Sequence, residues 1–360
     1  MKILLVTGGA GFIGANFVDY WLATYQADKV IVLDALTYAG NRASLASKDG
    51  NENFTFVHGN ICETNLVETL LKEHHINTIV HFAAESHVDR SIDGPDAFIE
   101  TNIIGTHSLL KAAKKIWLDQ PNEKGEQPLA HRFHHVSTDE VYGDLSPTDP
   151  AFTEGTQYAP NSPYSASKAA SDHLVRAYHH TYGLDVTTSN CSNNYGPLHF
   201  PEKLIPLVIT NILKNKALPI FGDGQQIRDW LFVTDHARGI DLVINKGRLG
   251  ECYNIGGMNE WANIDIVKLI CKLVNEAFAN QPNLATRFPL AKKAIIGNAE
   301  ELITYVKDRA GHDRRYAINP KKSMTELHYS PIETFDSGII KTVHWYLDNK
   351  AWWENLLEVK

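Results

Sequence analysis

The sequence has few of the residues that build disulfide scaffolds and metal centres. Its 360 residues include only four cysteines, and no two of them form a C-x-x-C pair. Scattered cysteines predict free thiols in a reducing cytoplasm rather than a disulfide framework. The 17 histidines include doublets such as His74–His75 and are not placed at the H-E-x-x-H spacing, so we expect no metal site.

Long apolar runs and positive charge are missing as well. No segment approaches the ~18 consecutive apolar residues of a membrane helix, and the net charge is −8. Without a basic stretch to neutralise a phosphate backbone, nucleic acid is not expected as a partner. The start, MKILLVTGGAGFIG, differs from a signal peptide because its apolar run is short and leads into a glycine loop. We therefore expect a cytoplasmic protein with neither a membrane nor a nucleic-acid partner.

What the sequence has is an alternation of short apolar strands and amphipathic helices. The expected strands cover 2–8, 29–34, 54–59, 78–84 and 132–138, and the expected helices cover 11–23, 63–73 and 96–117. This alternation predicts an α/β fold with a Rossmann-type, doubly wound parallel sheet built from βαβ units. The polar stretch 119–130 is expected to form a surface loop.

The pattern changes after residue 190. Short strands such as LPIFG (218–222) and DWLFV (229–233) alternate there with helices and several prolines. We expect a Rossmann domain over 1–190, with a segment near 230–260 returning to it. The remainder of 191–360 is expected to form a smaller, mixed α/β lobe.

Glycines separate the first expected strand from the first expected helix. Gly8, Gly11 and Gly14 give G-x-x-G-x-x-G, and the same run also fits G-x-G-x-x-G starting at Gly9. Missing side chains let a pyrophosphate approach the backbone, and the helix N-terminus supplies amide donors. Asp34, at the end of the second strand, can accept a hydrogen bond from an adenosine ribose and would repel a 2′-phosphate. The pattern predicts NAD rather than NADP, with a ligand-free strand–helix turn as the alternative.

Two pairs of titratable residues follow. Tyr164 and Lys168 stand four residues apart and would share one helix face, where an ammonium can stabilise a phenolate. By itself this pair would also fit an ordinary surface contact. Asp139 and Glu140 are adjacent and follow the strand 132–138. Close carboxyls need not both ionise, so one of them can keep its proton at neutral pH, with a helix-capping pair as the alternative.

Together these motifs resemble the extended short-chain dehydrogenase/reductase family, and more closely its dTDP-glucose 4,6-dehydratases. The glycine loop and Y-x-x-x-K are shared by the whole superfamily, whereas STDEVYGD (137–144) and HFPEKLIPL (199–207) are much more specific. The other matching segments are LTYAGN (36–41), AAESHVDRSI (83–92), SPYSASKA (162–169), NCSNNYGPL (190–198), QIRDWLFVTDHARG (226–239), YNIGG (253–257) and GHDRRYAI (311–318).

The resemblance implies that dTDP-glucose is converted to dTDP-4-keto-6-deoxyglucose with NAD as cofactor. Glucose is oxidised at C4, loses water across C5–C6 and receives the same hydride at C6. In this cycle Tyr164 is the base for the C4 hydroxyl, Lys168 lowers its pKa and holds the nicotinamide ribose, and Thr138 hydrogen-bonds the C4 oxygen. Glu140 takes the C5 proton, and Asp139 protonates the departing C6 hydroxyl. Relatives that only epimerise or reduce carry small residues at these last two positions.

The resemblance also implies contacts with both ligands. The residues implied for the cofactor are Gly8, Gly11, Phe12, Ile13, Gly14, Asp34, Thr37, Asn60, Ile61, Phe82, Ala83, Ala84, Ser86, Thr101, Tyr164, Lys168 and Asn194. Those implied for the nucleotide sugar are Ser86, Thr138, Asn193, Lys203, Leu204, Pro219, Ile220, Phe221, Arg228, Asn263, Asp308, Arg309 and His312. Arg228 offers a planar fork for a diphosphate, with a salt bridge to Asp229 as the alternative. Phe221 fits a stacking partner for the pyrimidine or, alternatively, a core residue.

The resemblance further implies a homodimer that pairs through the helix near 96–117 and the helix bearing Tyr164 and Lys168. Three departures from the family pattern stand out: Asn60 where aspartate is usual, a short segment after Tyr142, and Ala310 in place of proline. The first puts the strength of an adenine contact in doubt, and the second the shape of a loop over the site.

Other functions fit parts of the same pattern. Within the superfamily, the alternative is a nucleotide-sugar epimerase or a dehydratase of another nucleotide sugar. From a different class, the alternative is a non-catalytic NAD-binding scaffold, which the intact Tyr164, Lys168, Asp139 and Glu140 argue against.

Overall fold

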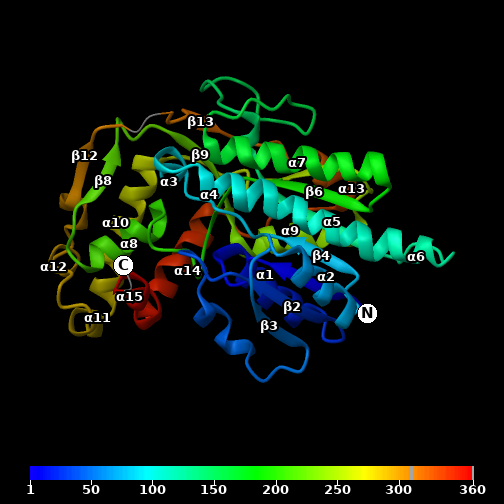
Figure 1. Ribbon diagram of the computed structural model, residues 1–360. Coiled ribbons are helices and arrows are strands. Elements are labelled where there is room, and N and C mark those ends of the chain that lie inside the picture. The colour runs from blue at the N-terminus through cyan, green and yellow to red at the C-terminus, as the bar shows by residue number, and fades with distance from the viewer. Residues whose placement is uncertain (309–310, 359–360) are drawn as a thin grey trace.

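A parallel sheet of seven strands forms the centre of the computed structural model, which describes residues 1–308 and 311–358 (Figure 1). In spatial order the strands are β10 (Cys252–Ile255), β6 (Val186–Cys191), β5 (Arg132–Thr138), β4 (Thr78–His81), β1 (Ile3–Thr7), β2 (Lys29–Asp34) and β3 (Phe54–His58). Neighbouring strands all run parallel. Because successive strands are added on both sides of β1, the sheet is doubly wound, and the predicted fold class is confirmed.

Strand β1 shows why the strands of this sheet have continuous apolar sequences. Leu4, Leu5 and Val6 are all fully buried. Leu5 packs with residues of α2 (Thr64–Glu73) and α5 (Thr106–Lys114), whereas Leu4 and Val6 pack with residues of α1 (Phe12–Thr24) and α9 (Val233–Lys246). Helices therefore cover both faces, and each strand residue meets an apolar layer whichever way it points.

The helix that carries Tyr164 and Lys168 is α7 (Pro163–Tyr182), and its ends are specified locally. Ser162 and Ser165 form a reciprocal capping box, and Pro163 occupies the first turn, where its missing N–H is not needed. Gly183 ends the helix in the left-handed conformation, with φ +74°. The helix begins directly beside the end of β5, so its first two turns face the carboxyl edge of the sheet.

Helical structure extends further than expected in the neighbouring segment. It runs through α3 (Val88–Asp93), α4 (Asp96–Phe98), the π-helical η2 (Ile99–Gly105), α5, the π-helical η3 (Lys115–Asp119) and α6 (Gln120–Glu123). The predicted helix over 96–117 is confirmed, but the predicted loop over 119–130 is wrong at its start. Trp117, Leu118 and Pro121 are buried and continue the apolar stripe. This packing outweighs the polar composition around them.

A second lobe, gathered at the left of Figure 1, has its own core and smaller sheets. Its strands are β7 (Asn193–Tyr195), β8 (Leu218–Phe221), β9 (Ile227–Phe232), β11 (Glu260–Ala262), β12 (Ile303–Val306) and β13 (Arg315–Tyr316). Its helices are α8 (Leu204–Leu213), α10 (Asn263–Asn280), α11 (Asn283–Arg287), α12 (Lys292–Ile295), η5 (Ala299–Leu302), α14 (Phe335–Asp348) and α15 (Lys350–Glu358). Trp230, Phe335 and Tyr346 belong to its buried core.

The chain passes between the two lobes more than once. After β9 in the second lobe, α9 and β10 pack on the first sheet, and α13 (Lys321–Leu327) packs against β10. The short turns η1 (Arg42–Lys48) and η4 (Asp139–Tyr142) follow β2 and β5. Within the described ranges, no helix is both long and apolar enough to cross a lipid bilayer.

A candidate active site at the carboxyl edge of the sheet

The strands β1, β2, β4, β5 and β6 end at one cleft of about 380 Å³. Ligands of open α/β sheets bind outside the carboxyl ends of the strands, at the point where the strand order reverses. Every residue predicted for the cofactor lines this cleft, as do all five predicted catalytic residues. The residues predicted from the sequence thus lie where the sheet topology places a ligand site.

The glycine loop is packed too closely for side chains. A Cβ at Gly14 would lie 2.3 Å from the carbonyl oxygen of Gly8, and a Cβ at Gly8 would lie 2.6 Å from the amide nitrogen of Ala83. Gly8 also has φ +69°, which L residues rarely adopt. Among the described residues no side chain caps α1 at Gly11, so its first-turn amides face the cleft as an anion site. This cradle fits a dinucleotide pyrophosphate.

Asp34 stands at the end of β2 and organises the loop around it. Its Oδ2 accepts a hydrogen bond from the amide of Ala10 at 2.8 Å, and its Oδ1 accepts one from the amide of Leu36 at 2.8 Å. Burial raises the pKa of this carboxyl, and the two amide hydrogen bonds oppose that rise. A carboxylate has further lone pairs, so a ribose hydroxyl could still donate to it.

The adjacent acids differ in environment. Thr138 ends β5 and caps η4, its hydroxyl accepting from the amide of Glu140 at 3.3 Å. Asp139 is only 2% exposed, and Glu140 is half-buried. Burial raises the pKa of Asp139 well above its ordinary value, and the nearby charges of Glu140 and Asp229 raise it further. The shift favours the protonated form of Asp139, which is the form an acid catalyst needs.

Tyr164 and Lys168 point into the cleft from the first two turns of α7. Burial and then the charge of Glu140 raise the pKa of Tyr164 well above its ordinary value, while a hydrogen bond with the Thr138 hydroxyl opposes this. The Lys168 ammonium donates to the carbonyl oxygen of Val136 at 2.9 Å, and burial lowers its pKa. That Lys168 lowers the pKa of Tyr164 stays a prediction.

Comparison with known proteins places this geometry in a family. A model of the family described as GDP-mannose 4,6-dehydratase matches residues 5–342. A dTDP-glucose 4,6-dehydratase of Escherichia coli is 53% identical, covering 99% of this chain and 97% of the relative. One from Xanthomonas campestris is 54% identical, with the same coverage of 99% and 97%. The chain belongs to the dTDP-glucose 4,6-dehydratase family.

Solved structures of the dTDP-glucose 4,6-dehydratase family share this fold. The enzyme from Bacillus anthracis, solved in complex with NAD, is 45% identical, with a TM-score of 0.84 and coverage of 99% of this chain and 100% of that one. A UDP-glucose 4-epimerase from Thermotoga maritima, solved with UDP-glucose, is 26% identical, with a TM-score of 0.78 and coverage of 97% and 100%. The fold is thus common to dehydratases and epimerases, and only the site residues separate them.

Part of the predicted sugar-nucleotide site does not reach the cleft. Ser86, Thr138, Asn193, Lys203 and Leu204 line it. The predicted residues outside its lining are Pro219, Ile220, Phe221, Arg228, Asn263, Asp308 and His312, and Arg309 lies outside the described residues.

These outlying residues belong to the second lobe, where local packing accounts for their positions. Ile220 is buried in that lobe's core, because alternate residues of β8 face opposite sides. Phe221 is 41% exposed, so the core alternative for it is wrong. The Arg228 guanidinium donates to the carbonyl oxygen of Asp313 at 2.9 Å and lies 4.2 Å from the centre of the Tyr316 ring.

The cleft of this dehydratase-family chain also contains residues that the sequence did not single out. They include Tyr38, Glu85, Ser137, His199, Phe200 and Glu202. Glu202 lies within HFPEKLIPL, so the specificity of that motif was an available signal. Phe12 stacks on His199 with ring centroids 4.2 Å apart, a contact between the glycine loop and residue 199 that the sequence could not show.

Proposed function

We propose that this protein dehydrates dTDP-glucose to dTDP-4-keto-6-deoxyglucose with bound NAD. One observation carries the proposal: a buried Asp139, whose raised pKa favours the protonated form, lies next to Glu140 in the cleft that holds Tyr164 and Lys168. An elimination needs two groups in opposite protonation states at the same carbon–carbon bond. An epimerase needs only the tyrosine and the lysine.

The glycine loop, Asp34 and the residues after β4 would hold the cofactor. NAD would supply a hydride acceptor for C4 and return the hydride to C6. The protein's own groups then move protons. Tyr164 takes the proton of the C4 hydroxyl, Glu140 takes the C5 proton that the new ketone has acidified, and Asp139 protonates the departing C6 oxygen. When the hydride is returned to C6, Glu140 gives its proton back to C5.

The proton balance gives Thr138 a second task. In each turnover Tyr164 gains the proton of the C4 hydroxyl and Asp139 loses one to the departing water. The Thr138 hydroxyl is hydrogen-bonded to Tyr164 and lies 3.4 Å from Asp139 Oδ1. A hydroxyl both donates and accepts, so it can pass the proton from the phenol back to the carboxylate. The site then resets itself without taking a proton from solvent.

The nucleotide sugar would extend from the cleft toward the second lobe. Ser86, Asn193 and Lys203 lie at the cleft itself, whereas Arg228, Asn263, Asp308 and His312 lie beyond it. The charge of Arg228 lowers the pKa of Asp139, so the guanidinium is close enough to act on the catalytic carboxyl. A planar guanidinium there suits the diphosphate, and the exposed ring of Phe221 suits stacking on the base.

The functional unit would be a homodimer in the cytoplasm. Helices η2 and α5 pack beside α7, as Figure 1 shows. Ile99 and Ile104 on η2 are 45% and 52% exposed, which leaves apolar surface for a second copy. Light scattering would show twice the chain mass if the copies pair, and charged substitutions at both isoleucines should then give monomers.

Product analysis tests the proposed reaction. Purified protein incubated with dTDP-glucose should give a product lighter by one water, and UDP-glucose should react more slowly. Deuterium placed at C4 should appear at C6 of the product. An unchanged mass with an inverted C4 centre would identify an epimerase, and bound NAD without turnover would identify a scaffold.

A further inference from the structure

Lys168 is a cation placed where water cannot reach it easily. Lys168 is only 4% exposed. Burying an ammonium group is unfavourable unless an opposite charge compensates for it. The hydrogen bond to the carbonyl oxygen of Val136 supplies a dipole but no charge. Asp139 is a poor source of that charge, because burial raises its pKa and favours the neutral form.

Asp172 lies one helical turn after Lys168 on the same face of α7. Its residue is 6% exposed, and its Oδ2 accepts hydrogen bonds from the Ser137 hydroxyl and the Tyr158 phenol, both at 2.9 Å. Its Oδ1 lies 3.1 Å from Nε2 of His135. The two hydrogen bonds, from β5 and from the loop before α7, therefore fix the carboxylate in one orientation.

The charge on Asp172 is balanced by Lys168 rather than by His135. Burial lowers the pKa of His135 well below its usual range, and Lys168 lowers it further, so the imidazole is neutral at neutral pH. Burial raises the pKa of Asp172 to about 6, with Lys168 as the largest opposing influence. In return, Asp172 is the largest influence that raises the pKa of Lys168 against burial.

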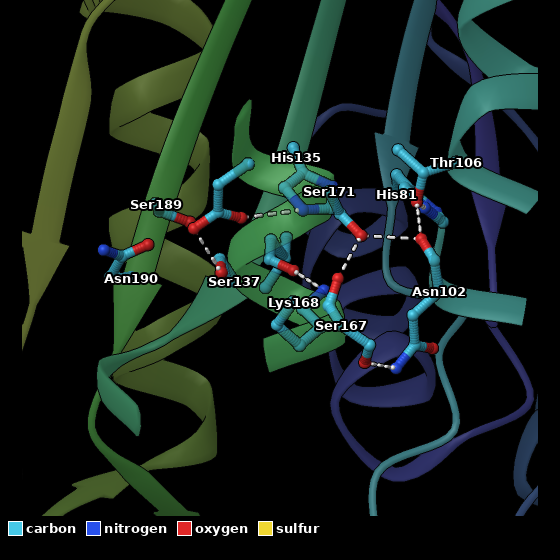
Figure 2. A network of polar contacts seen from close by, with 12 residues as sticks. His81, Asn102, Thr106, His135, Ser137, Ser167, Lys168, Ser171, Ser189 and Asn190 are labelled. Carbon is cyan, nitrogen blue, oxygen red and sulfur yellow. Dashed lines mark hydrogen bonds and ion pairs between the residues drawn. The ribbon is translucent and has the colours of Figure 1, made fainter. Parts of the chain in front are cut away.

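A buried network of polar contacts surrounds this part of α7, as Figure 2 shows. The Asn102 amide donates to the Ser167 hydroxyl at 2.8 Å, and the Ser171 hydroxyl donates to the carbonyl oxygen of Asn102 at 2.6 Å. Both serines flank Lys168 on the helix. The position of Asp172 relative to Lys168 is thus fixed by contacts on both sides of the helix.

Asp172 is also in contact with a second cavity. It lines this cavity, of about 910 Å³, together with Tyr158, His173 and Arg176.

We propose that Asp172 is a positioning residue, whose buried carboxylate, one turn further along α7, keeps the Lys168 side chain charged beneath the cleft. The kinetic consequence rests on the proposed function, but the charge coupling between the two side chains does not. Without the carboxylate, Lys168 would lose its proton at a lower pH and would no longer support the phenolate of Tyr164.

Other titratable groups surround the pair and must be tracked in any titration. Those that face Lys168 are His81 on β4, His135 on β5 and Cys191 on β6. Those that face Asp172 are Tyr142 on η4, Tyr158, His173 on α7 and Cys252 on β10. Burial lowers the pKa of the two histidines well below the usual value and raises the pKa of both cysteines well above the usual value.

The first test measures the pKa of Lys168 directly in the folded protein without substrate. Lysine labelled with ¹³C at Cε would be titrated by NMR, with Lys168→Arg to assign the signal. In Asp172→Asn the pKa of Lys168 should fall by about one pH unit or more, a tenfold change. Asp172→Glu should restore it, and Ser137→Ala, which keeps the carboxylate, should change it much less. An unmoved pKa in folded Asp172→Asn would overturn the proposal.

A reciprocal test, made by changing Lys168, measures the same charge coupling if Asp172→Asn does not fold. Coupling between two groups is mutual, so removing the lysine charge must raise the pKa of the carboxyl. In Lys168→Gln the pKa of Asp172, read from its ¹³Cγ signal, should rise from about 6 by about one unit or more. A value unchanged by this substitution would refute the coupling.

The kinetic readout separates charge coupling from a general structural defect. In Asp172→Asn the alkaline limit of cofactor reduction should move to lower pH by the same amount as the Lys168 pKa. A structural defect would lower the rate at every pH without moving the profile, and that result would also count against the proposal. The NMR result stands by itself if the preferred substrate proves to be another nucleotide sugar.

Discussion

The two walls of the cleft are built in different ways. The glycine-loop wall comes from segments that directly follow β1, β2 and β4, and its fit depends on backbone approach, as at Gly8 and Gly14. The opposite wall combines β5, α7, residues 192–204 and the edge of the second lobe, and its chemistry depends on buried side chains. Backbone fit follows from local sequence, whereas burial is decided by segments far apart in the chain.

This contrast predicts that the walls can be disabled separately. Changes on the side-chain wall should stop individual proton transfers while the cofactor stays bound. Changes on the glycine-loop wall should weaken the cofactor without altering the order of the chemical steps.

The largest effect is expected when both acids are removed. Asp139→Asn with Glu140→Gln should still allow C4 oxidation, so reduced cofactor and a 4-keto hexose should accumulate. An amide can serve neither as the acid nor as the base, and each lost group should slow elimination roughly 10²–10⁴-fold. Rapid-mixing absorbance and mass spectrometry would measure this.

The matched control for the two acids is Glu126→Gln, an exposed charge on a loop, which should leave both steps unchanged. If the double variant produced no reduced cofactor, the acids would not be dedicated to elimination. The side-chain wall would then act as one unit rather than as separable groups.

Tyr164→Phe is expected to slow the earlier step, the oxidation at C4, rather than the elimination. Without the phenol the C4 hydroxyl loses its base, and cofactor reduction should slow roughly 10²–10⁴-fold. Single-turnover absorbance would follow the reduction. Tyr182→Phe is the control, because Tyr182 lies on the same helix but is 48% exposed, away from the cleft. Normal reduction in Tyr164→Phe would show that another group removes the proton.

A smaller effect is expected on the glycine-loop wall. Asp34→Ala removes a charged acceptor and the repulsion of a 2′-phosphate, so NAD binding should weaken by roughly 1–3 kcal/mol and the preference over NADP should shrink. Calorimetric titration with both cofactors would measure this. Asp34→Asn is the control, since it keeps one acceptor oxygen near the amides of Ala10 and Leu36. Unchanged NAD affinity in Asp34→Ala would contradict the predicted ribose contact.

The smallest effect concerns stability rather than rate. Burial raises the pKa of Asp139 above its unfolded value, so its contribution to stability is complete below about pH 4 and declines as pH rises toward the folded pKa. Asp139→Asn does not titrate, so it should gain stability relative to the parent protein between pH 5 and pH 8. Thermal unfolding at several pH values would show a widening gap in Tm, whereas Glu126→Gln should show a constant one.

The sequence by itself determined the fold class and the residues of the glycine-loop wall. Alternating apolar strands and helices, three glycines at one strand end and Asp34 at the next are local patterns, and the backbone geometry they require is local too. The helix bearing Tyr164 and Lys168 was also specified locally, by its capping box and its C-terminal glycine.

Only the tertiary structure decided how the titratable groups differ from one another. Asp139 and Glu140 are neighbours in sequence, yet Asp139 is buried with a raised pKa while Glu140 is half-buried. Asp172 carried no sequence signal, since its importance depends on Ser137 and Tyr158, which lie 35 and 14 residues away. Protonation depends on which distant groups exclude water, and that is settled only when the chain has folded.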